Sequence, residues 1–503
     1  MRVRRQRIAP GRDSRGAEVF LALGLLLLCG CAVGPRYAKP TTPAPPQYKE
    51  LPPNWKAAQP SDQVAKGKWW EVFQDPQLNA LEEQVNVSNQ TLKAAHAQFE
   101  QARAVVRINR SFQYPTVTAG VSATRNHQST NRPNGRLAPT STYTDLQLPV
   151  DASYEADVWG RVRRTVEAAR ANAQASAADL ESVSLSLHAE LASDYYQVRA
   201  LDAEEQLLNS TVAAYQEALD LTQNRYNGGV ASQVDVAQAQ TQLETTRAQA
   251  IDLGVQRAQF EHAIAVLAGR PPSTFSLAPV PLASTPPVIP TGLPSDLLER
   301  RPDIAANERR MAVANAQIGV AKAAYYPTII LSATGGFEGN SITNWFNGPS
   351  GFVAAGASAL ETVFDAGRRR AVTDQARVAY DQSVANYRET VLNAFQDVED
   401  NLAALRLLED EAKTENAAVA SAEHSLALSN NRYKGGVATH LEVITAQSIA
   451  LSDQRVAVEI AGRRMTACVS LIKALGGGWN VSDLPLVRKD NLPKDNQQSA
   501  RGQ

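Results

Sequence analysis

The residue types that most often carry out catalysis are present, but their spacing fits none of the common catalytic motifs. The six histidines are scattered, and none of them forms the HExxH pattern of a zinc protease. The chain contains neither a GxxxxGK[ST] phosphate-binding loop nor a GxSxG nucleophile turn. The glycines from Gly476 to Gly478 do not open a helix after a strand, as a phosphate cradle does. The sequence therefore predicts no catalytic residue, no metal site and no cofactor, and predicts that the chain is not an enzyme.

A cysteine near the N-terminus does predict a covalent modification. An arginine-rich leader precedes an apolar run, Val19–Leu28, which at about ten residues is too short to cross a bilayer as a mature helix. This pattern is typical of a signal peptide. The following residues, Leu28-Cys29-Gly30-Cys31, resemble a bacterial lipobox, in which a small residue precedes the lipidated cysteine. Cys31 fits this pattern and Cys29 does not; an ordinary cleavage site with two incidental cysteines is the alternative.

Charge and hydropathy exclude several classes of protein. The 50 Lys+Arg residues balance 51 Asp+Glu residues, so the charge indicates no nucleic-acid partner. No apolar run of about 18 residues follows Leu28, which excludes transmembrane helices, and any membrane span must consist of strands. Ala32, in place of an aspartate after Cys31, resembles an outer-membrane sorting signal. Cys468, the only other mature cysteine, is predicted to be a small buried hydrophobe.

The chain contains an internal duplication. Tyr-Pro-Thr at 114–116 recurs at 326–328, and Gly160-Arg161 recurs as Gly367-Arg368. NRYNGGVASQVDVAQAQ, which starts at Asn224, recurs as NRYKGGVATHLEVITAQ, which starts at Asn431. The agreement is too extensive for a shared helical composition. The predicted domains are a signal peptide (1–30), a proline-rich lipid-anchored tether (31–60), a first repeat (61–270), a linker (271–294), a second repeat (295–480) and a polar C-terminal tail (481–503).

Long helices are predicted within each repeat. Segments 161–227 and 368–434 lack proline and glycine and are rich in helix-forming residues, so each predicts one helix about 100 Å long. Segments 229–270 and 436–477 predict the returning helices, while 76–112 and 295–325 predict further helical stretches. The repeated glycine pairs then predict a tight turn between outgoing and returning helices, because glycine adopts the left-handed backbone at a helix C-terminus.

Elsewhere apolar residues occupy every second position, as in a strand, and no longer follow the helical period. Residues 146–157, in the predicted strand pair 114–157, alternate strictly between apolar and polar or proline. Residues 117–123 and 329–337 do the same, and 352–364 does so more weakly. This alternation suits strands with one face toward lipid and one toward water, although an ordinary soluble sheet is the alternative. On this pattern Asp151, Glu155 and Asp157 face the water-filled side.

Four strands per chain cannot close a barrel, and open sheet edges are not tolerated in lipid. The missing strands must therefore come from other copies, and a trimer would supply about twelve, within the range of known barrels. Arginine clusters at 161–164 and 368–370 stand where strand becomes helix. They are predicted to pair with Asp157 and Asp365 or to contact membrane phosphates, with ordinary ion pairs between helices as the alternative.

The ordered motifs resemble the outer-membrane factors of tripartite efflux systems, the TolC-like channels, and fit their lipoprotein branch best. The resemblance covers about residues 31–480. It is carried by the lipobox at Cys31, Trp69-Trp70, both Tyr-Pro-Thr motifs, LPSDLLERRPDIAANERRMAVANAQIGVAKAAYYPTI at 293–329, the RYxGGV phrases and LGGGW at 475–479. It implies an α+β fold, in which a twelve-stranded transmembrane β-barrel, with four strands from each chain of a homotrimer, continues as a long helical barrel across the periplasm.

The same resemblance implies a function and partners. A channel of this family is a passive exit duct in the outer membrane, which docks on a periplasmic adaptor coupled to an inner-membrane pump, here of RND type. The implied adaptor contacts are the two tips, Arg225, Tyr226, Gly228 and Gly229 with Arg432, Tyr433, Gly435 and Gly436.

The implied periplasmic constriction is formed by Leu441 and Thr445, one helical turn apart. Thr445 stands where the family often has aspartate, so a hydrophobic ring of Leu441 is predicted in preference to an ionic lock; Glu442 and Asp235 are the nearby carboxylates. The alternative function is that of a periplasmic coiled-coil adaptor or structural lipoprotein, which would need neither alternating strands nor the duplicated long span.

Overall fold

A computed structural model describes residues 32–41, 43–50, 68–129, 142–283, 285–287, 289, 294–480, 482 and 484. The signal peptide and Cys31 lie outside this part of the chain, as do most of the tether and the C-terminal tail. The chain divides into two compact units. Unit 1 comprises Met1–Pro40, Glu100–Ala173 and Glu308–Ala385, and unit 2 comprises Thr41–Phe99, Gln174–Asn307 and Asn386–Gln503. Each unit takes segments from both repeats, so the compact units differ from the sequence repeats.

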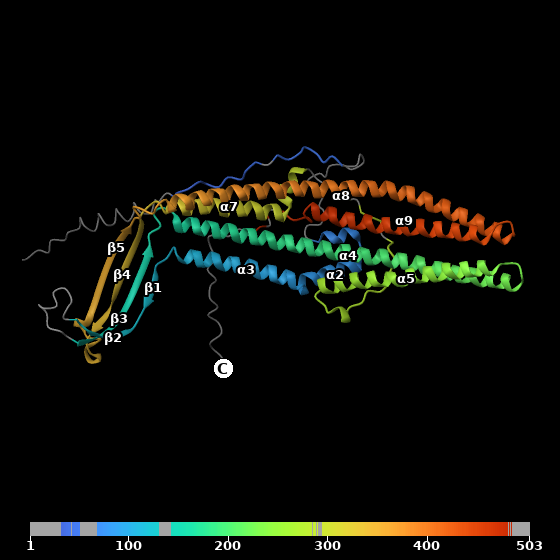
Figure 1. Cartoon of the computed structure of the whole chain (residues 1–503). Helices are drawn as coiled ribbons and strands as arrows, with labels where there is room; N and C mark the ends of the chain where they lie inside the picture. The colour runs from blue at the N-terminus through green and yellow to red at the C-terminus, as the bar shows by residue number, and fades with distance from the viewer. Residues whose placement is uncertain are drawn as a thin grey trace, which may run out of the picture. The chain divides into compact units, whose positions relative to one another are not determined.

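Unit 1 contains an antiparallel sheet (Figure 1). Its strands are β1 (Thr116–Ala119), β2 (Ser122–His127), β3 (Thr142–Glu155), β4 (Thr328–Gly339) and β5 (Gly351–Leu360). Both β1 and β2 pair with β3, at opposite ends of it, and β3, β4 and β5 follow side by side. Because β1 and β2 share one edge of β3, the sheet of five strands is four strands wide. Within the described residues, the outer edges of β1/β2 and β5 pair with no further strand.

Three details of the strands differ from the prediction, and one of them is that β5 ends at Leu360 although the sequence predicts a strand at 352–364. The predicted strand at 117–123 is interrupted at Gly120, whose N–H donates to the carbonyl of Pro149 at 3.0 Å. Pro149 has no N–H with which to continue a regular ladder. The strand predicted at 146–157 ends at Glu155, so the placement of Asp157 in the strand is wrong. Asp157 instead lies in the connection to the next helix.

The strand-to-helix connections of unit 1 use the same device twice. At the start of α4 (Arg161–Asn227), the Asp157 carboxylate accepts the backbone N–H groups of Val162 and Arg163 at 2.9 and 2.8 Å. At the start of α8 (Arg368–Lys434), Asp365 accepts those of Gly367 and Arg369. A carboxylate suits this position because the N–H groups of a first turn lack partners. Arg163 and Arg369 also pair with these aspartates, which confirms the predicted pairing.

The N-terminal segment of unit 1 binds across α4 and α7 (Pro302–Ala323). The buried Arg164 donates to the carbonyls of Val33 and Gly34, and Tyr37 donates to the Glu308 carboxylate at 2.5 Å. Gly34 lies so close to α7 that a Cβ atom there would be 2.5 Å from the Cα of Gly319. The residues that follow Cys31 are therefore fixed to the folded body.

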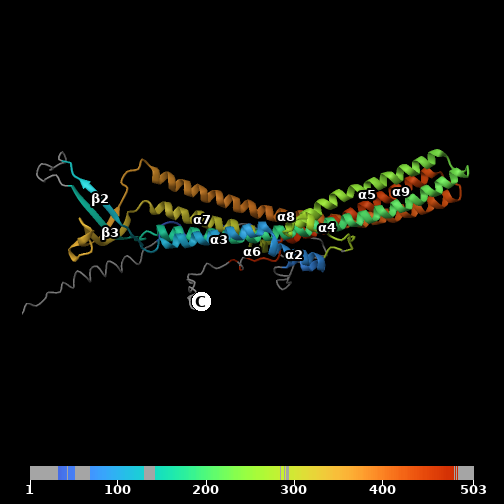
Figure 2. The ribbon, with the colours of Figure 1, turned by 90° about the horizontal axis from the view of Figure 1, so that it is seen from below.

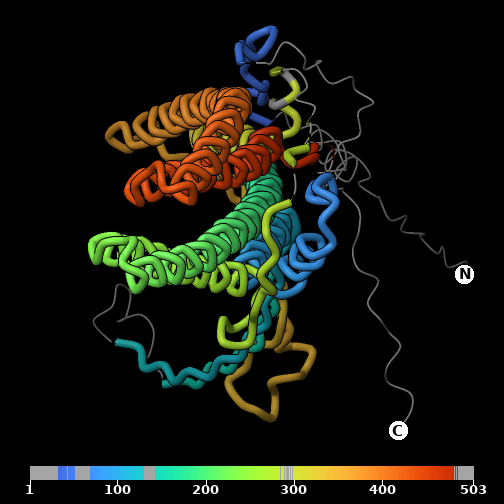
Figure 3. The backbone as a smooth tube through the Cα atoms, turned by 90° about the vertical axis from the view of Figure 1, so that its right-hand side faces the viewer, coloured from blue at the N-terminus to red at the C-terminus, as the bar shows by residue number. Residues whose placement is uncertain are grey.

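Two helical hairpins, α4 with α5 (Gln233–Leu267) and α8 with α9 (His440–Ala474), are shown in Figures 2 and 3. Apart from the first residues of α4 and α8, which belong to unit 1, they lie in unit 2. The two outgoing helices have 67 residues each and the two returning helices 35 each, as expected for a duplication. Large buried side chains include Tyr195 and Leu208 on α4, Tyr387 on α8 and Met465 on α9. Cys468 is also fully buried, as predicted, and burial raises the pKa of its thiol to about 12.

Both shorter helical stretches are divided, although the sequence predicts each as continuous. The first forms α2 (Pro76–Ser88) and α3 (Gln90–Ser111), because buried Asn89 accepts the N–H of Leu92 and donates to the carbonyl of Leu267. The second forms α6 (Leu297–Arg300) and α7, because a residue before proline disfavours helical backbone. None of the described helices is both long and apolar enough to cross a membrane.

Candidate functional site

The repeated glycine phrases form the two hairpin turns, and the glycine pair and the following valine donate the same backbone hydrogen bonds in each. In the first turn, Gly229 donates to Tyr226 and Val230 donates to Arg225. In the second, Gly436 donates to Tyr433 and Val437 donates to Arg432. Gly229 and Gly436 have φ of 75° and 73°, the left-handed region. The predicted turn is confirmed, and the second glycine of each pair is the one that the backbone requires.

The two turns differ in what surrounds their tyrosines. Tyr226 is 40% exposed, whereas Tyr433 is 9% exposed. Tyr433 lies beneath the guanidinium of Arg225, whose Cζ is 4.5 Å from the ring centroid, and against the ring of His440 at 5.3 Å. Arg225 comes from the first hairpin and His440 begins α9 of the second. The second tyrosine is therefore a contact between hairpins, and the first is available on the surface.

His440 is buried and connects the start of α9 to α4. Its Nε2 lies 3.4 Å from the hydroxyl of Thr222, which itself donates to the carbonyl of Ala218. The Thr222 hydroxyl is thus an acceptor for His440, and the neutral imidazole carries its hydrogen on Nε2. Burial, the largest cause, lowers the pKa of His440 below its usual value; nearby Asp235 opposes this shift and Arg225 adds to it.

Leu441 and Thr445 lie on one face of α9, as their spacing predicts. Leu441 is 57% exposed, and Thr445 is exposed with its hydroxyl directed to the Leu441 carbonyl at 2.9 Å. Of the nearby carboxylates, Glu442 pairs with Arg432 at 2.7 Å. Asp235 forms a capping box with Ser232 at the start of α5. Both carboxylates therefore have partners other than Leu441 and Thr445, and a constriction formed by these two residues stays a prediction.

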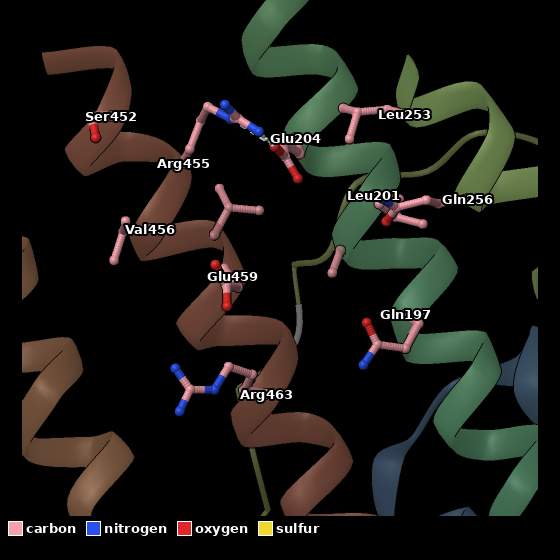
Figure 4. Close-up of a pocket in the computed structure, with 12 residues that line it drawn as sticks. Gln197, Leu201, Glu204, Leu253, Gln256, Ser452, Arg455, Val456, Glu459 and Arg463 are labelled. Carbon is pink, nitrogen blue, oxygen red and sulfur yellow. Dashed lines mark hydrogen bonds and ion pairs between the residues drawn. The ribbon is translucent and has the colours of Figure 1, made fainter. Parts of the chain in front are cut away.

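Further from the turns, a pocket of about 570 Å³ lies between α4, α5 and α9 (Figure 4). Arg455 of α9 crosses it and pairs with Glu204 of α4 at 2.6 Å. Leu201 and Leu253, which line the pocket, belong with Leu451 to one apolar cluster contributed by the same three helices. The two hairpins are therefore joined by packing and charge along their length as well as at the tips.

The three predicted water-facing acids of the sheet have different surroundings. Asp151 is exposed in β3, opposite Thr118 of β1 and Thr334 of β4. Glu155 accepts two hydrogen bonds from Arg161. Asp157, outside the strand, caps α4. Only Asp151 of these three keeps both a strand position and an exposed carboxylate, and its direction toward a lumen stays a prediction.

Sequence reasoning found both turns but missed Thr222 and His440. The sequence did contain a signal for His440, because it is one of the positions at which the two copies of the repeated phrase differ. The first copy has Gln233 at the corresponding place. The pairing of Arg455 with Glu204 had no such signal, since these residues are far apart in sequence and in no repeated motif.

Comparison with known proteins gives consistent matches over almost the whole chain. A family model described as outer membrane efflux protein matches residues 81–270 and 293–477, one segment in each repeat. A Pseudomonas putida protein described as a probable efflux pump outer membrane protein, TtgC, is 33% identical over 91% of this chain and 95% of its own length. The pyoverdine export outer membrane protein OpmQ of Pseudomonas aeruginosa is 32% identical, over 94% of this chain and 99% of its own.

A solved structure of the outer-membrane channel OprN agrees with the fold over most of the chain. Its TM-score is 0.81 at 28% sequence identity, over 89% of this chain and 100% of that chain. The fold is that of the TolC-like outer-membrane channels, as the sequence predicts.

Proposed function

Because the chain belongs to the outer membrane efflux protein family, it is an outer-membrane channel component of an efflux pump, and we propose that it works as a homotrimeric exit duct. The sheet is the observation that carries this proposal. Backbone groups on the outer edges of β1/β2 and β5 pair with no strand of the described chain. In lipid each such group would cost several kcal/mol, roughly, so sister copies must pair the edges.

Exposed apolar side chains of the sheet support the same proposal. Val117 of β1 is 64% exposed and Val353 of β5 is 85% exposed, and both lie on the face opposite Asp151. Such residues are costly in water and favourable against lipid or a neighbouring copy. We place Asp151 on the water-filled side of the closed sheet, where its charge gives a mild preference for cations.

Family membership and the exposed residues of the two hairpin turns support a proposal about the partners. We propose that a periplasmic adaptor binds the two turns at Arg225, Tyr226, Gly228 and Gly229 and at Arg432, Tyr433, Gly435 and Gly436, and that an inner-membrane pump of RND type supplies the energy. The exposed Val230 and Val437, 70% and 74% exposed, give each turn an apolar contact for this partner. Leu441 and Thr445 narrow the duct in the resting state, and a lipid on Cys31 adds an anchor in the outer membrane.

One variant distinguishes membrane attachment through the lipid from membrane attachment through the strands. Cys31→Ala removes the proposed lipid site and leaves the strands unchanged. An outer-membrane duct is expected to remain in the membrane fraction, to need detergent for extraction and to keep the mass of three chains. A variant that becomes freely soluble as a monomer would instead indicate the alternative, a periplasmic adaptor held to the membrane by its lipid.

A further inference from the structure

We propose that Thr222, Arg225, Tyr433 and His440 form a latch that holds the two hairpin tips together, and that protonation of His440 releases it. The inference rests on the proposed function, since the latch fixes the first turn of α9, where Leu441 directly follows His440. It adds a condition for opening, namely acidification of the periplasm, to a duct that otherwise conducts passively.

The latch joins elements from both repeats. Thr222 and Arg225 come from α4, Tyr433 from the end of α8 and His440 from the start of α9. Thr222, Tyr433 and His440 are 0%, 9% and 5% exposed, so the contact excludes water. Besides the cation–π contact, Arg225 donates to the Tyr433 carbonyl at 3.4 Å. Separation of the hairpins at this point must break all of these contacts together.

His440 is the group whose protonation the latch cannot accommodate. Within the described residues its Nδ1 is buried without a hydrogen-bond partner, and this is the atom that takes up a proton when Nε2–H faces Thr222. A new cation there would stand beside Arg225 and at the first residue of α9, where the helix dipole disfavours positive charge. Two cations would also compete for the face of one tyrosine ring.

The remaining charged groups around the tip do not remove this conflict. Asp235 of α5 attracts a protonated His440, but its carboxylate already accepts two hydrogen bonds from Ser232. Arg432 of α8 and Glu442 of α9 are paired with each other. The released state, in which His440 is solvated, therefore binds the proton more tightly than the latched state.

The direction of the pH effect follows from this difference. Since the latched state has the lower pKa, the latch is most stable above about pH 6.5, the ordinary value for histidine. Its stability falls as pH drops below that value, because the released state gains protons that the latched state excludes.

Ion conductance of the purified full chain in planar lipid bilayers tests the latch. Between about pH 7.5 and about pH 5.5 we expect the open fraction to rise about three- to tenfold, within the limit of about tenfold that linkage sets for one histidine with a pKa of about 6.5 in the released state. His440→Gln, which places the residue of the first repeat in the second, should abolish this rise. Tyr433→Leu should raise the open fraction already at neutral pH, and His424→Gln, at an exposed histidine of α8, is the matched control for His440→Gln.

The possible results distinguish a failure of the latch proposal from a failure of the duct proposal. A wild-type chain that conducts equally at both pH values, or a His440→Gln variant that keeps the rise, overturns the latch and leaves the duct intact. A correctly assembled chain that conducts at no pH, even with Tyr433→Leu, overturns the duct itself.

A second measurement covers the case in which Tyr433→Leu does not assemble. Hydrogen exchange of residues 217–240 and 424–447 in the wild-type chain, corrected for intrinsic rates, should increase at acid pH and should not do so in His440→Gln. Equal protection of the wild-type tips at both pH values would contradict the release of the latch.

Discussion

The two copies of the glycine turn have nearly the same backbone and different surroundings. Gly229 and Gly436 adopt the same left-handed conformation, and the backbone hydrogen bonds donated by the glycine pair and the following valine are the same in both turns. Tyr226 is nevertheless exposed, while Tyr433 is buried under Arg225 and His440. Duplication thus preserved the turn and allowed the side chains around it to diverge, so one copy presents a surface and the other joins the hairpins.

The largest expected difference between the turns concerns their tyrosines. Tyr433→Ala removes a buried ring and its contacts, and should lower the free energy of unfolding by about 3 kcal/mol. Tyr226→Ala removes an exposed ring and should cost about 0.5 kcal/mol. Thermal unfolding of both variants in detergent measures the difference. Equal losses would show that the two tyrosines have the same surroundings in the assembled protein.

Substitution of the glycines should affect both turns alike. Gly229→Ala and Gly436→Ala place a Cβ atom on left-handed backbone and should each cost about 1 to 2 kcal/mol. A Cβ atom at either position meets nothing within 4 Å, so the loss reflects backbone conformation alone. Gly435→Ala, whose backbone is not left-handed, is the control and should change the unfolding temperature little. A larger loss at Gly435 than at Gly436 would contradict the assigned turn geometry.

Substitution of the arginines should give the smallest difference in stability between the two turns. Arg225→Gln removes the cation over the Tyr433 ring and should cost about 1 kcal/mol. Arg432→Gln breaks a pair with Glu442 in which both side chains are partly exposed, and should cost about 0.5 kcal/mol or less. Repeating the unfolding measurements at high salt sharpens the comparison, because salt should erase the effect of Arg432→Gln first. A larger loss of stability in Arg432→Gln than in Arg225→Gln would contradict the assignment of Arg225 to the contact between the hairpins.

Local sequence patterns predicted much of the fold. Absence of proline and glycine located α4 and α8, and the glycine pairs located both turns, because each of these signals acts on the backbone of the residues that carry it. The end of β3 was missed, since Asp157 continues the alternation but is used by the first turn of α4.

The candidate site was harder to predict. The contact of Arg225 with Tyr433 depends on how two helices from different repeats approach each other, and no spacing within either repeat specifies that approach. The same reason explains why the division of α2 from α3 was missed, because Asn89 is held by the carbonyl of Leu267, which is distant in sequence.

In the proposed assembly, copies of this chain enclose a water-filled path through the outer membrane. Single-channel recording of the purified, detergent-extracted chain inserted into planar lipid tests it most directly. We expect discrete conductance steps with a mild preference for cations that declines in Asp151→Asn. Trimers that insert into the bilayer and carry no ion current under any condition would contradict it.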